Sequence, residues 1–177
     1  MDFSYLFNII KGSDHIRNLN ALLQQSGRPV IALKGMSGSQ DALYAAAFYE
    51  AFPGRIVFVL PDREEAAYFL NDLENILGER SALFFPSSLK KPYTFPYLDN
   101  NNVLLRAEVL THLSKNLKPL PVVTYAEAFQ EKVVTKKALV SNTVEARVGE
   151  KLSVDFIIEF LNEKKFEKKN FTMKAGK

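Results

Sequence analysis

A turn containing two glycines comes closest to a chemical motif. It runs Leu33-Lys34-Gly35-Met36-Ser37-Gly38-Ser39-Gln40-Asp41-Ala42. The apolar run 30–33 before it predicts a buried strand, and 41–51 after it predicts a helix, which is the setting of a phosphate-binding loop. In the pattern G-x-x-x-x-G-K-[ST], glycines let backbone amides wrap the phosphates, the lysine neutralises them, and the hydroxyl holds magnesium.

Three of the residues that this chemistry needs are replaced in the turn. With Gly35 as the first glycine, Gln40 stands at the second glycine, Asp41 at the lysine and Ala42 at the hydroxyl. At roughly 4 Å and an effective dielectric of about 20, the Asp41 charge would repel each phosphate charge by about 4 kcal/mol. We therefore expect Gly35 and Gly38 to make a tight turn and Asp41 to cap the helix. Binding of a simple anion at the helix N-terminus and nucleotide hydrolysis are the alternatives.

A second candidate is the segment 86–102, which is rich in proline, lysine and aromatic residues. It follows a predicted strand at 82–85, and ligands of open α/β sheets usually bind beyond the carboxyl ends of strands. Tyr93, Phe95 and Tyr97, with Lys90 and Lys91 nearby, could stack on single-stranded nucleic acid. The alternative is a surface loop that is stiffened by prolines and packed down by its tyrosines.

The amino-acid composition excludes several kinds of metal site and catalytic site. The chain has no cysteine and only two histidines, His15 and His112, which excludes thiolate metal sites, His-rich metal sites and a cysteine nucleophile. Glu64 and Glu65 are adjacent acids, but they fall in a predicted first helical turn, where acids favour the helix dipole. The sequence therefore predicts no catalytic group, no cofactor and no metal.

The charge of +3 is unevenly distributed. Residues 163–177 hold six lysines and two glutamates, a charge of +4, which leaves −1 for residues 1–162. The lysine-rich tail could contact phosphates, or it could be the solvated face of an edge strand. No apolar run approaches the roughly 18 residues of a membrane span, and the first residues lack the basic start of a signal peptide. We expect a soluble cytoplasmic protein.

Apolar runs alternate with helical stretches along the chain. Runs at 30–33, 56–60, 82–85 and 120–123 lack polar alternation, which predicts a parallel sheet covered by helices on both faces. Asp14, Asp62 and Thr124 are predicted helix caps. This α/β domain is expected to span 1–133. Residues 134–177 are expected to be the cut first half of a small α+β domain, with an extended segment at 138–148, a helix from Ser153 or Asp155, and a strand at 166–173.

The order and spacing of several short motifs, over essentially all 177 residues, resemble one family. The motifs are the turn Leu33–Ala42, Val59-Leu60-Pro61-Asp62, Phe95-Pro96-Tyr97 with Asp99 (similar to an "LPYD" stretch), a helix with Arg106 and Leu110, and Val148-Gly149, Leu152, Leu161, Phe166, Met173 and Gly176. Together they resemble the UvrB-like N-terminal module of bacterial transcription-repair coupling factors (the Mfd family), with a degenerate phosphate-binding loop.

The resemblance implies a role within a larger protein. Such factors recognise stalled RNA polymerase, release it with a C-terminal ATP-dependent DNA translocase, and recruit the damage-recognition protein UvrA for nucleotide excision repair. Their N-terminal module recruits UvrA and maintains a repressed state without hydrolysing ATP. Tyr93, Phe95, Tyr97, Asp99 and Arg106 then form a candidate partner loop. The UvrA-contacting residues of the family are expected beyond Lys177, just after this sequence stops.

Overall fold

The fold is known from a computed structural model. It describes residues 3–163 except 26, 28, 53, 90–98, 116–117, 145–147, 150 and 152. The chain divides into two compact units, Met1–Leu139 and Val140–Lys177. The elements are α1 (Phe3–Lys11), α2 (Asp14–Gln24), α3 (Gln40–Ala51), β1 (Val57–Leu60), α4 (Arg63–Leu77), β2 (Leu83–Phe85), α5 (Asn100–Ser114), β3 (Val122–Tyr125), α6 (Ala126–Gln130), α7 (Lys136–Ser141) and α8 (Val154–Glu163).

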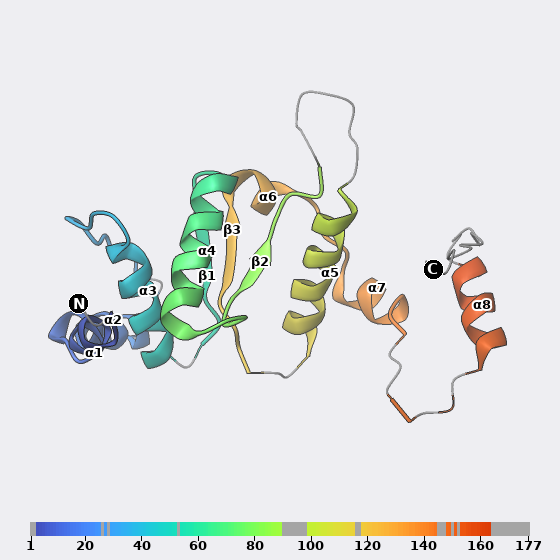
Figure 1. Cartoon of the computed structure of the whole chain (residues 1–177), viewed down its shortest axis with the longest axis horizontal. Coiled ribbons are helices and arrows are strands. Elements are labelled where there is room, and N and C mark those ends of the chain that lie inside the picture. Colours follow the sequence, from blue (N-terminus) through green and yellow to red (C-terminus); the bar gives the residue numbers. More distant parts are fainter. Residues whose placement is uncertain are drawn as a thin grey trace, which may run out of the picture. The chain divides into compact units, whose positions relative to one another are not determined.

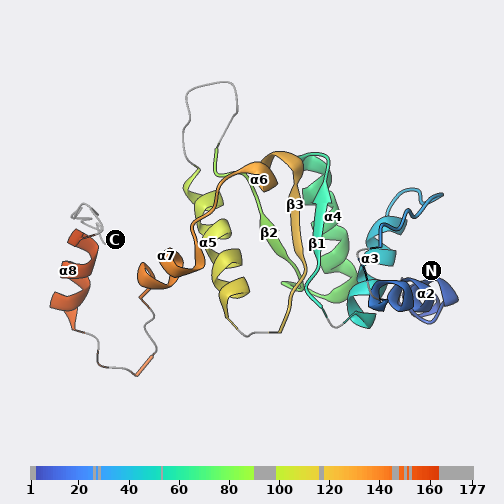
Figure 2. The same ribbon diagram turned by 180° about the vertical axis from the view of Figure 1, so that it is seen from behind.

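The first unit is a mixed α/β structure with a parallel three-stranded sheet. The strand order is β1-β3-β2, with Val57 opposite Val122 and Leu83 opposite Val122 on the other side. Helix α4 covers one face over β1 and β3 (Figure 1), and from behind, the strands lie in front of it (Figure 2). Helix α5 packs against β2. The predicted α/β class and parallel strands at 56–60 and 82–85 are therefore confirmed.

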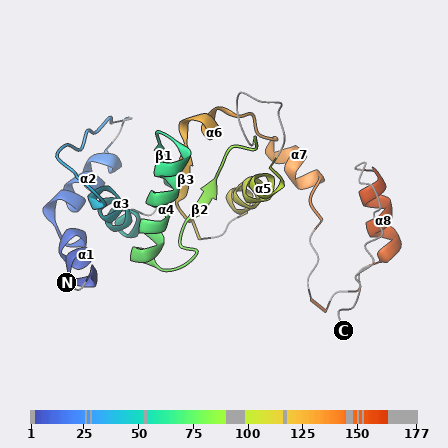
Figure 3. The same cartoon turned by 45° about the horizontal axis from the view of Figure 1, so that its top comes forward.

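Two apolar clusters hold this unit together. The larger joins α3, α4 and β3 through residues such as Ala46, Leu73 and Val123, and the rings of Phe58 and Phe69 lie 5.2 Å apart at its margin. The smaller, under α5, contains Phe85, Val109 and Val122. Helix α3 packs between α4 and the α1–α2 pair (Figure 3). Its alanine-rich sequence lets these helices approach closely, because alanine adds little side-chain volume between them.

Helix α4 follows the sequence signals closely. Asp62 is the N-cap, and its carboxylate accepts a hydrogen bond of 2.9 Å from the Glu65 amide. Glu64 and Glu65 occupy the first turn, where they favour the positive end of the helix dipole. Gly78 ends the helix with a φ of 101°, a conformation that only glycine adopts without strain. The predicted cap at Asp62 is confirmed.

The predicted strand at 30–33 is wrong. Residues 29–34 belong to no strand of the described chain, and Val30 is 99% exposed. An apolar run becomes a strand only where a hydrogen-bonding neighbour is available. Here Leu33 lies across a hollow from β1 instead of beside it.

The extended segment predicted at 138–148 is also wrong in its first part, because residues 136–141 form α7. Lysine, alanine and leucine are good helix formers. The Thr135 hydroxyl accepts a hydrogen bond of 3.2 Å from the Ala138 amide, as an N-cap does. Residues 145–147 lie outside the described residues, and so does the strand predicted at 166–173.

Two predicted helix caps and one predicted strand differ from the structure by one or two residues. Ser13, not Asp14, caps α2, and its hydroxyl accepts from the Ile16 amide at 3.5 Å. The last strand is Val122–Tyr125 instead of 120–123, so Thr124 lies inside β3 and does not cap α6. Its hydroxyl donates instead to the Phe85 carbonyl at 2.7 Å. In the second unit, α8 begins at Val154 as expected, and Ser153 Oγ accepts from the Phe156 amide at 3.3 Å.

Candidate functional site

The turn before α3 is built on two glycines in the left-handed region. Gly35 has a φ of 84° and Gly38 a φ of 57°, and a Cβ at either position would meet no atom within 4 Å. Glycine is favoured there because of the backbone conformation, since space is not limiting. The predicted tight turn is found at Gly38, where the Gln40 amide donates to the Ser37 carbonyl at 3.4 Å, whereas Gly35 lies in a bend before it.

The side chains that follow this turn bond to its backbone amides. Gln40 Oε1 accepts from the Ser37 amide at 3.1 Å, and Asp41 Oδ1 accepts from the Ala42 amide at 2.7 Å. Ser39 occupies the N-cap position, so Asp41 is not the cap that the sequence predicted, although its carboxylate does bond to an amide of the first turn. Two amides that could face a phosphate therefore already have acceptors within the protein.

Ala42 is fully buried in the larger apolar cluster, with an exposed fraction of 0%. A residue at this position directs its side chain into the core between α3 and α4. The alignment places the magnesium-binding hydroxyl of a working loop here. A hydroxyl on this Cβ would lie among apolar neighbours and would lack access to a solvated metal ion.

A hollow beside the turn is acidic. Asp41 from α3 lines it together with Glu65 and Asp72 from α4, and the hollow also contacts Gly38 and Ser39 of the turn. Three carboxylates beside one small hollow disfavour a polyanion by Coulomb repulsion. Within the described residues, no group of three His, Cys, Asp or Glu side chains is arranged to hold a metal ion.

A separate polar cluster lies at the carboxyl ends of β2 and β3. Arg106 of α5 donates from Nη1 to the carbonyl oxygens of Pro86, at 2.8 Å, and Ala128, at 3.3 Å. The same atom lies 3.3 Å from Glu131 Oε2, and the guanidinium carbon is 4.0 Å from the centre of the Phe85 ring. Arg106 is only 7% exposed. It therefore joins β2, α5 and α6 from inside the fold.

Glu131 completes this cluster. Its carboxylate accepts from the hydroxyls of Ser87 and Ser88 and from the Ser88 amide, the last at 3.0 Å and 3.1 Å to its two oxygens. Burial acts to raise the pKa of Glu131. The hydrogen bonds from the serines and the charge of Arg106 outweigh it and hold that pKa below its ordinary value. For Arg106, burial lowers the pKa, against the opposing effect of Glu131.

The base of the segment 89–98 is closed by hydrogen bonds. The Asp99 amide donates to the Ser88 carbonyl at 2.9 Å, and Asn102 Nδ2 donates to the Ser87 carbonyl at 2.8 Å. Asp99 is also the N-cap of α5, accepting from the Asn101 amide at 3.1 Å. Tyr93, Phe95 and Tyr97 lie outside the described residues, but both ends of the segment that carries them are fixed.

One residue of the candidate partner loop is therefore assigned incorrectly. Arg106 is not a surface residue, because its guanidinium is enclosed by Pro86, Ala128, Glu131 and the Phe85 ring. The sequence reasoning missed Glu131, Ser87, Ser88 and Asn102. One signal could have found the cluster: Asn102 and Arg106 share a helical face with Val109 and Leu113, so that polar groups occupy a buried stripe.

The two histidines lie on different helices. His15 is exposed on α2, and His112 is half-buried in the last turn of α5. Within the described residues, no helix is long and apolar enough to cross a membrane. Comparison with protein-family models, with curated proteins and with solved structures finds no match to this chain.

Proposed function

We propose that this chain is a non-catalytic binding module. The observation that carries the proposal is the state of the first turn of α3, where Gln40 and Asp41 accept the hydrogen bonds of two backbone amides and Ala42 is sealed in the core. A nucleotide would have to displace both acceptors, approach three carboxylates and find magnesium without a hydroxyl ligand. Each of these requirements opposes phosphate binding.

We further propose that it is the UvrB-like N-terminal module of a bacterial transcription-repair coupling factor, with a degenerate phosphate-binding loop. The order and spacing of the sequence motifs support this proposal, and the parallel α/β architecture is compatible with it. The parent protein would release stalled RNA polymerase with a DNA translocase elsewhere in its chain, and this module would help to recruit UvrA in the cytoplasm. It would itself need no cofactor.

In this proposal the Arg106–Glu131 cluster positions the segment that carries Tyr93, Phe95 and Tyr97. A network whose members all have partners makes a rigid support for a loop. The cluster thus supports the segment 89–98. In this proposal the partner contacts are made by that segment and by the domain expected from residue 134 onwards.

The experiment is co-elution with UvrA on size-exclusion chromatography. A chain extended through the second domain of its parent is expected to elute with UvrA, and the present 177 residues alone are expected not to do so. If the extended chain and UvrA elute separately at concentrations near 10 µM, a value typical of weak specific complexes, the assignment to coupling factors fails. The non-catalytic assignment is tested separately by nucleotide titration.

A further inference from the structure

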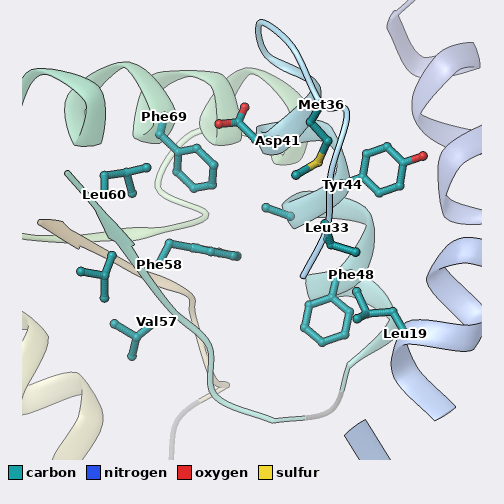
Figure 4. Close-up of a pocket in the computed structure, with 12 residues that line it drawn as sticks. Leu19, Leu33, Met36, Asp41, Tyr44, Phe48, Val57, Phe58, Leu60 and Phe69 are labelled. Atoms are coloured by element: carbon teal, nitrogen blue, oxygen red, sulfur yellow. The ribbon is translucent and has the colours of Figure 1, made fainter. Parts of the chain in front are cut away.

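We draw no further inference here: the strongest candidate, the apolar hollow of about 330 Å³ between β1, α4 and the segment before α3 (Figure 4), lies along an edge of the described sheet, and nothing in the structure shows what covers that edge.

Discussion

Arg106 Nη1 of α5 lies 3.3 Å from Glu131 Oε2, just beyond α6. The two residues stand 25 positions apart in the sequence, and their contact joins the two segments that leave β2 and β3. Ser87 and Ser88 bond to the same carboxylate from the end of β2. This ion pair and its hydrogen bonds therefore hold the two ends of the segment 89–98 together.

Replacing Arg106 with alanine should destabilise the fold strongly. The change leaves Glu131 as a partly buried charge without its cation, and it removes the donor to Pro86 and Ala128. Breaking one partner of a buried pair typically costs about 3 to 5 kcal/mol. Urea unfolding followed by circular dichroism measures the loss. Exposed Arg63→Ala is the matched control, with an expected change within about 0.5 kcal/mol. Equal losses in both variants would show that the cluster is not a structural anchor.

The stability of the wild type should fall in acid partly through Glu131. Its folded pKa is below the ordinary value of 4.5, so its stabilising effect is fully present above about pH 4.5 and is lost as pH falls through the folded pKa. Glu131→Gln should have a lower unfolding free energy than the wild type at pH 7. The difference between the two proteins should become smaller as the pH falls. Urea unfolding over this pH range checks the sign, with exposed Glu79→Gln as the control. If this difference in unfolding free energy stays constant with pH, Glu131 does not contribute to the loss of stability in acid.

Placing a hydroxyl-bearing residue at position 42 should damage the core instead of restoring a metal site. Ala42→Thr adds two heavy atoms to a side chain with no exposed surface, and overpacking typically costs about 1 to 3 kcal/mol. Ala67→Thr, at an exposed position in α4, carries a similar helix-propensity cost. It should destabilise the protein much less than Ala42→Thr. Thermal unfolding distinguishes them. Equal melting temperatures would mean that position 42 tolerates a larger side chain.

The sequence predicts a feature correctly where the interacting residues lie close together along the chain. Asp62 lies directly before a helix and bonds to the amide three residues later, a pattern that needs no tertiary information. The apolar runs at 56–60 and 82–85 became strands because other strands pair with them. The equally apolar run at 30–33 did not, and pairing depends on the whole fold, so its composition could not decide the outcome.

The polar cluster was harder to predict because its members come from distant segments. Arg106 and Glu131 have no periodic relation in the sequence, and Ser87 and Ser88 read as ordinary turn residues. At the turn before α3, by contrast, the replacement of the lysine and hydroxyl by Asp41 and Ala42 was visible directly. The structure adds that Ala42 is buried and that Asp41 bonds to its own helix.

The most direct test of the non-catalytic assignment is a calorimetric titration of this chain with magnesium-ATP at low salt. We predict no binding heat at roughly millimolar nucleotide, because the amides, charges and core packing at the start of α3 all oppose phosphate. Binding with a dissociation constant near 1 µM, worth about 8 kcal/mol, would contradict the account. It would mean that Asp41 does not stand where the phosphate-binding lysine would be.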